Sequence, residues 1–200
     1  MNLPNKLTVL RIIMVPFFVF FMLADFIPYR FLYAFLLFSV ASYTDRLDGQ
    51  IARKRGLITN FGKLMDPLAD KILVMAALIC FVKLDLASTA CVIIIMFREF
   101  AVTSIRLIAV EQGKVIAANN WGKAKTVSQM VAIITILVLQ TAMQFTAGPG
   151  MGFVMENMAI AVHASVILAI GEVLIYIATL LTLISGVIYV RDSAELFQDM

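Results

Sequence analysis

The sequence predicts an all-α membrane protein with six transmembrane helices, and three observations support this fold class. Of the 200 residues, 62% are hydrophobic and 14% are charged, and the mean hydropathy is +0.97. A soluble domain is usually about half apolar and about a quarter charged. Six apolar stretches are long enough to cross a bilayer. Basic residues gather in alternate connections between these stretches, as they do in multi-pass proteins.

The six stretches are predicted to form one transmembrane domain over residues 1–200, because their connections are mostly short and no low-complexity linker divides them. The first stretch ends at Asp25-Phe26-Ile27-Pro28 rather than at a small-residue cleavage pattern, which predicts a retained helix. The predicted segments are Leu7–Ala24, Phe31–Ile51, Lys63–Val82, Ser88–Val110, Thr126–Phe145 and Ser165–Val190.

The positions of the basic residues predict the orientation of the chain. Residues after the second, fourth and sixth segments are basic, whereas 146–164 contains no lysine or arginine. This asymmetry predicts a multi-pass protein of the cell membrane with both termini in the cytoplasm. The basic face suits anionic membrane lipid or anionic substrates, and no nucleic-acid-binding module is present. The basic residues concerned are Arg53, Lys54, Arg55, Lys114, Lys123, Lys125 and Arg191.

Four aspartates lie at the predicted cytoplasmic ends of the second and third helices. Asp45 and Asp48 are three residues apart, and Asp66 and Asp70 are four apart, so each pair shares a helix face. The short connection between the two helices makes them antiparallel neighbours, so the pairs can meet at one depth. Converging carboxylates repel one another unless a cation neutralises them. Oxygen-only ligands favour magnesium, manganese or calcium, so the sequence predicts a metal site here.

Small and basic residues complete this region. Gly49 and Ala52 lie on the same helix face as Asp45 and Asp48 and have little or no side chain, so an extended ligand can approach the backbone there. Arg53 supplies positive charge for phosphate. A purely structural interpretation is a set of interfacial acids balanced by Arg46, Lys63 and Lys71. Four carboxylates in register beside glycine and alanine favour a functional site instead.

Together these residues form the pattern Asp45-x2-Asp48-Gly49-x2-Ala52-Arg53-x8-Gly62-x3-Asp66-x3-Asp70, which fixes eight residues across 26 positions. The pattern resembles the signature of the CDP-alcohol phosphatidyltransferases, with every invariant position present. This resemblance implies six transmembrane helices, a homodimer, and two divalent ions, Mg²⁺ or Mn²⁺, at the cytoplasmic face. It also implies that an alcohol displaces CMP from a CDP-linked lipid.

The resemblance also assigns roles within the pattern. It implies metal binding by all four aspartates, and it makes Asp70 in addition the base that deprotonates the acceptor hydroxyl. The residues that it implies for the CDP moiety are Gly49, Ala52, Arg53 and Gly62.

Three further segments are similar to the phosphatidylglycerophosphate synthase subfamily. They are Asn2–Arg11, the Arg98-Glu99 pair with Arg106, and Gly122–Thr126 with Gln129. This similarity implies transfer of a phosphatidyl group from CDP-diacylglycerol to sn-glycerol 3-phosphate in phospholipid biosynthesis.

The residues of the fourth helix support a phosphate-bearing acceptor independently. Arg98 and Arg106 lie about two turns apart in an apolar helix, where cations require an anion, and only Glu99 is nearby in sequence. Lys123 and Lys125 are predicted to approach from the neighbouring cytoplasmic loop. A phosphate bound by these four side chains accounts for the surplus of positive charge.

Other interpretations of these residues stay open at the sequence level. Arg98 can instead pair with Glu99 and reach the interface, and Arg106 and Lys125 can anchor to lipid headgroups. Asn5 and Thr8 either cap and support the first helix or contact the cytidine or a phosphate of the CDP-lipid.

Three alternative functions are compatible with part of the pattern. Another family member would use inositol phosphate, serine or phosphatidylglycerol as its acceptor. A membrane prenyltransferase needs two separate aspartate-rich motifs and usually more helices. A divalent-cation transporter would place its acids near the midplane, often between internal repeats, whereas here they flank the cytoplasmic connections.

Overall fold

The computed structural model of the chain contains six α-helices and describes residues 3–55, 60–111, 120–147 and 158–193. Side chains are described for residues 6–44, 69, 71–109, 120–146 and 165–193. The predicted all-α fold with six helices is confirmed. The helices are α1 (Leu3–Leu23), α2 (Arg30–Arg55), α3 (Asn60–Lys83), α4 (Thr89–Glu111), α5 (Asn120–Ala147) and α6 (Met158–Asp192).

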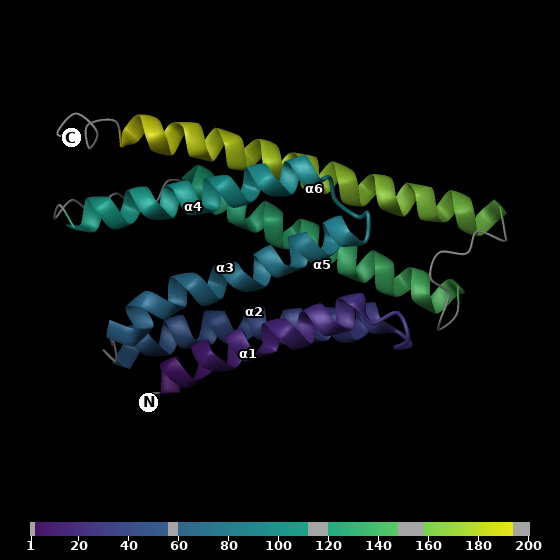
Figure 1. Cartoon of the computed structure of the whole chain (residues 1–200), viewed down its shortest axis with the longest axis horizontal. Coiled ribbons are helices and arrows are strands. Elements are labelled where there is room, and N and C mark those ends of the chain that lie inside the picture. The colour runs from purple at the N-terminus through teal and green to yellow at the C-terminus, as the bar shows by residue number, and fades with distance from the viewer. Residues whose placement is uncertain (1–2, 56–59, 112–119, 148–157, 194–200) are drawn as a thin grey trace.

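Successive helices run in opposite directions along the long axis of the bundle (Figure 1). The start of α1, the end of α2, the start of α3, the end of α4, the start of α5 and the end of α6 therefore lie at one end, which we call the motif end. Helix α1 packs against α2 and α3, α5 packs against α2 and α6, and α4 packs against α6. This arrangement brings the starts of α3 and α5 and the ends of α4 and α6 to the same end of the bundle.

Several helices extend beyond the apolar stretches that predicted them. Helix α2 continues to Arg55, α5 begins at Asn120, and α6 begins at Met158. Hydropathy detects the apolar centre of a helix, whereas backbone hydrogen bonding continues through the polar turns at its ends. One expectation is corrected as a result: Lys123 and Lys125 lie in the first two turns of α5, not in a loop.

Three helices are long and apolar enough to cross a bilayer within the part of the chain that the structure describes. The candidate spans are Lys6–Leu23, Asn120–Thr146 and Ser165–Asp192. The described apolar part of α2, Arg30–Thr44, is shorter. Many large apolar side chains along these spans are exposed, for example Phe17, Val131 and Leu180. Such surfaces suit contact with lipid tails, and the chain is a membrane protein.

The buried core runs through all six helices and is apolar. Phe18 of α1 and Phe38 of α2 are fully buried, with ring centroids 5.8 Å apart. Phe81 of α3, Ile95 of α4 and Leu137 of α5 belong to the same cluster. Burial of large side chains between the helices fixes their relative positions, and with them the polar groups near the motif end.

The turn between α3 and α4 has a defined helix stop. Asp85 adopts a left-handed backbone conformation, with φ of 56°, and its N–H donates to the Val82 carbonyl at 3.2 Å. The N–H of Leu86 donates to the Phe81 carbonyl at 2.8 Å, which completes a Schellman motif. Leu86 and Phe81 are both buried in the core, so the turn is anchored by packing as well. The relative placement of α3 and α4 is therefore fixed at the end opposite the motif.

Candidate active site

The four aspartates of the sequence pattern lie on two antiparallel helices at the motif end (Figure 1). Asp45 and Asp48 occupy the last three turns of α2, and Asp66 and Asp70 occupy the first three turns of α3. Their side chains lie outside the described residues, as do those of Gly49, Ala52, Arg53 and Gly62. The helix positions and the oxygen-only donor set fit a hard divalent cation such as Mg²⁺ or Mn²⁺.

A second polar group is described in full and centres on Glu99 of α4. Its carboxylate forms ion pairs with Lys71 at 3.8 Å, with Arg98 at 3.8 Å, and with Lys125. We call these four residues the Glu99 cluster. All four side chains are mostly buried, and Lys125 is only 4% exposed. Charges removed from water in this way need partners of opposite sign, and one carboxylate here serves cations from three helices.

Lys71 follows Asp70 directly and connects α3 to α4. Its ammonium group donates to the Glu99 backbone carbonyl at 3.2 Å and to the Thr103 hydroxyl. The Thr103 hydroxyl in turn donates to the Glu99 carbonyl at 2.6 Å. Lys71 therefore joins the helix that carries Asp66 and Asp70 to the helix that carries Arg98 and Arg106.

Arg98 spans the interface between α4 and α6. Its guanidinium donates to the Ser185 hydroxyl of α6 at 2.5 Å. A Cβ atom at Gly186 would lie 3.0 Å from the Arg98 Cγ, so the absence of a side chain there lets Arg98 pass close to the α6 backbone. Arg98 therefore contacts both Glu99 and α6. If Arg98 only neutralised Glu99, the contact with α6 would not be needed.

Arg106 lies two turns beyond Arg98 on α4 and contacts α6 one turn beyond Ser185. Its guanidinium carbon is 6.0 Å from the centre of the Tyr189 ring, within cation–π range. Two guanidinium groups and a phenol thus face the same seam between α4 and α6.

The two lysines of α5 differ in their surroundings. Lys125 is buried and contacts Glu99, whereas Lys123 is exposed. Residues two positions apart on a helix point to different sides, so Lys123 faces away from Lys125. The structure brings Arg98 and Lys125 together around Glu99 and places Arg106 against the Tyr189 ring of α6. Lys123 lies outside the cluster among the described contacts.

The first helix contributes buried polar groups near its start. Thr8 is fully buried and Arg11 is 1% exposed, although α1 is otherwise strongly apolar. Because α1 begins at Leu3, Asn5 and Thr8 stand within its first two turns rather than at the N-cap position. The side chain of Asn5 lies outside the described residues. The burial of Thr8 and Arg11 places them inside the bundle with α2 and α3, the neighbours of α1.

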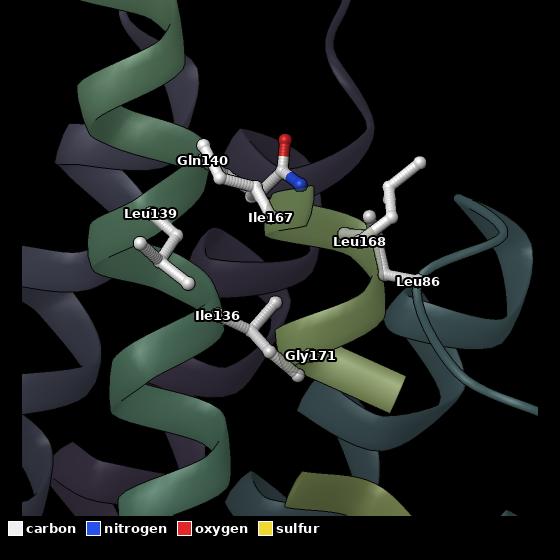
Figure 2. Close-up of a pocket in the computed structure, with 7 residues that line it drawn as sticks. All are labelled: Leu86, Ile136, Leu139, Gln140, Ile167, Leu168 and Gly171. Carbon is white, nitrogen blue, oxygen red and sulfur yellow. The ribbon is translucent and has the colours of Figure 1, made fainter. Parts of the chain in front are cut away.

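A pocket lies at the other end of the bundle, between α5 and α6 beside the α3–α4 turn (Figure 2). Its lining is apolar except for the amide of Gln140, and no charged residue is among the described residues that line it. It therefore lacks the groups that phosphate or metal chemistry requires. The lining residues are Leu86, Ile136, Leu139, Gln140, Ile167, Leu168 and Gly171.

Sequence reasoning missed Thr103, Ser185 and Tyr189, and it considered Lys71 only as a balancing charge for the aspartates. A signal for the α6 residues was present, because Thr179, Thr182, Ser185 and Tyr189 recur at intervals of three or four in an apolar helix. That spacing predicts a polar stripe facing other helices. The partners of the stripe depend on how α4 and α6 pack, which periodicity does not reveal.

Comparison with known proteins finds related sequences that cover most of the chain. The model of the family described as CDP-alcohol phosphatidyltransferase matches residues 1–184. A Bacillus subtilis protein named CDP-diacylglycerol–glycerol-3-phosphate 3-phosphatidyltransferase is 46% identical over 159 residues, which cover 74% of this chain and 82% of the relative. A protein of the same name from Rickettsia felis is 34% identical over 98% of this chain and 97% of its own length. A third, from Pseudomonas fluorescens, is 35% identical over 78% and 82%, respectively.

Proposed function

Because the chain belongs to the CDP-alcohol phosphatidyltransferase family, we propose that it transfers the phosphatidyl group of CDP-diacylglycerol to sn-glycerol 3-phosphate. The products are phosphatidylglycerophosphate and CMP, and the reaction is a step in phospholipid synthesis. The observation that carries this proposal is the name shared by relatives that match nearly the whole chain. The enzyme is a phosphatidyltransferase, and its family generally uses a divalent metal.

The aspartates of α2 and α3 are the proposed chemical centre. Asp45, Asp48, Asp66 and Asp70 would hold two divalent ions, which would stabilise the negative charge on the transferred phosphate and on CMP. Asp70 accepts the proton of the acceptor hydroxyl as general base. The acceptor oxygen then bonds to the phosphorus of the phosphatidyl group, and the bond from that phosphorus to CMP breaks. CMP leaves with the electron pair of that bond.

The CDP-lipid is proposed to lie along the start of α1 and the facing ends of α2 and α3. The small residues of the pattern leave room for the pyrophosphate and cytidine, and Arg53 supplies positive charge. Thr8 is fully buried on α1, the helix that packs against both α2 and α3, which is consistent with this placement. The proposed CDP-lipid-binding residues are Asn5, Thr8, Gly49, Ala52, Arg53 and Gly62.

The acceptor phosphate is proposed to bind between α4, α5 and α6. Arg98 and Arg106 face the same seam with α6, and guanidinium groups recognise phosphate through charge-assisted hydrogen bonds. Lys125 stands beside Arg98 through their shared contact with Glu99. Lys123, which is exposed, contributes from the edge of this region. Lys71 connects this subsite to the helix of Asp70.

The membrane arrangement belongs to the same proposal. All six helices cross the bilayer as one domain of residues 1–200, with both termini and the motif end in the cytoplasm, and two copies form a homodimer. The excess of lysine and arginine near the motif end supports this orientation. The acyl chains of the substrate then stay in the bilayer while the headgroup meets a water-soluble acceptor.

An acceptor panel tests the proposed reaction. Purified protein in detergent with CDP-diacylglycerol and Mg²⁺ is given glycerol 3-phosphate, inositol phosphate, serine or phosphatidylglycerol in parallel. CMP release and the mass of the lipid product are measured, with a reaction lacking acceptor as the control. We expect rapid CMP release and a phosphatidylglycerophosphate product with glycerol 3-phosphate. Faster turnover with any of the other three acceptors would reject this choice of substrate.

A further inference from the structure

Tyr189 of α6 is a buried phenol whose hydroxyl has no hydrogen-bond partner among the described residues. Its side chain is 5% exposed. Buried tyrosine hydroxyls normally find a partner, so an unpaired one calls for an explanation. Other hydroxyls of the same polar stripe are satisfied within their own helix: Thr179 donates to the Ile175 carbonyl at 2.7 Å, and Thr182 to the Ala178 carbonyl at 2.6 Å.

The surroundings of Tyr189 are those of an anion site. Arg106 lies over its ring, and Ser185, one turn earlier on α6, accepts a hydrogen bond from Arg98. The Nε of Arg98 is also buried and has no hydrogen-bond partner among the described residues. Two unpaired polar groups, one of them cationic, therefore occur on facing sides of the seam between α4 and α6.

A phosphate group offers acceptor oxygens, the kind of partner that both of these donors lack. It carries three strongly accepting oxygens and a charge between −1.5 and −2 near neutral pH, roughly as for a phosphorylated side chain. The guanidinium groups supply charge and the phenol supplies a neutral donor, so the site gains a directed hydrogen bond without further repulsion between cations. A metal ion does not fit, because guanidinium groups have no lone pair to offer.

We propose that Tyr189 is a specificity-determining residue of the acceptor subsite, whose hydroxyl donates a hydrogen bond to the phosphate that Arg98 and Arg106 bind. This inference rests on the proposed function for the identity of the acceptor, glycerol 3-phosphate. It adds a residue of α6 to a subsite otherwise built from α4 and α5. It also accounts for a buried hydroxyl that has no hydrogen-bond partner among the described residues.

The substitution Tyr189→Phe tests the proposal because it removes the hydroxyl and keeps the ring under Arg106. A hydrogen bond to a charged group such as phosphate corresponds to about a 10- to 150-fold change in affinity. We expect the KM for glycerol 3-phosphate and the inhibition constant of inorganic phosphate to rise together by about that factor. The KM for CDP-diacylglycerol should stay within about twofold of wild type. The melting temperature should be unchanged or higher, because an unpaired buried hydroxyl has been removed.

Tyr176→Phe is the matched control, since Tyr176 lies on the same helix but is exposed. It should change none of these quantities. An unchanged KM and phosphate inhibition constant in Tyr189→Phe would overturn the proposal. Equal increases in the KM for both substrates, together with a lower melting temperature, would also overturn it, because they indicate a packing role for Tyr189.

Phosphate binding without turnover separates this inference from the proposed function. Inorganic phosphate should raise the melting temperature of the wild type more than that of Tyr189→Phe. If wild type releases no CMP with glycerol 3-phosphate but this difference persists, the proposed acceptor is wrong and the anion site stands. If wild type turns over and the difference is absent, the role of Tyr189 is wrong and the proposed function stands.

Discussion

Glu99 shows how a single acid can organise several cations inside a membrane protein. Its carboxylate contacts Lys71, Arg98 and Lys125, and its backbone carbonyl accepts a hydrogen bond from Lys71 as well. Removing one of these cations therefore does not leave the carboxylate unpaired, because two cations remain. This decides what a substitution of Arg98 should do to stability.

Arg98→Ala should raise the KM for glycerol 3-phosphate about 10- to 150-fold, since a hydrogen bond between charged groups contributes roughly 1.5–3 kcal/mol. The KM for CDP-diacylglycerol should change far less. Arg98→Lys should restore only part of the affinity, because lysine keeps the charge but loses the planar fork. Kinetics with each substrate varied in turn measure both effects.

The melting curve of Arg98→Ala completes this test. It should lie close to that of wild type, because Glu99 keeps Lys71 and Lys125. A clearly lower melting temperature, together with equal increases in the KM for both substrates, would contradict the role of Arg98 in binding the acceptor. Arg98 would then serve mainly to neutralise Glu99.

At the scale of helices, Lys71 is the polar connection between the aspartate helix and the arginine helix. Few residues of α3 and α4 pack directly together, and α3 packs mainly against α1. The Schellman turn fixes α3 and α4 at the opposite end, and Lys71 joins them again near their middles. The spacing between Asp70 and the proposed acceptor subsite therefore depends on the Lys71 side chain.

Lys71→Met should lower both turnover and stability. The loss in unfolding free energy should be about 1–3 kcal/mol, because the partly buried oxygens of Glu99 and Thr103 lose a charged hydrogen-bond donor. Lys71→Arg should recover part of both losses. Lys83→Met, at the exposed far end of the same helix, is the matched control and should behave as wild type. Melting curves of Lys71→Met and Lys83→Met that coincide would show that Lys71 does not hold α3 to α4.

The helices were largely predictable from sequence, because long apolar runs separated by short, often basic connections are typical of transmembrane helices. The ends of the helices were less predictable. Hydropathy did not detect the polar first turns of α5, with Lys123 and Lys125, because helical hydrogen bonding does not need apolar side chains. The Arg98–Ser185 and Lys71–Thr103 contacts were not predictable either. They join helices distant in sequence, and only the packed core determines which faces meet.

For the whole molecule, the fold separates two kinds of chemistry and brings them to one end. The aspartates come from α2 and α3, and the cations proposed to bind phosphate come from α4 and α5, with α6 packed against both of these helices. All of these helices meet at the motif end because successive helices alternate in direction (Figure 1).

The most direct test of metal-dependent phosphatidyl transfer is product formation from CDP-diacylglycerol and glycerol 3-phosphate, with Mg²⁺ or Mn²⁺ titrated and then chelated. Wild type should require the added ion, lose activity in EDTA and regain it when the ion is restored, because clustered carboxylates need a cation. Asp70→Asn should lose about 100- to 10,000-fold in turnover while its melting curve stays near wild type. Full activity of dialysed wild type in excess EDTA, or near-normal turnover of Asp70→Asn at saturating metal, would contradict the account.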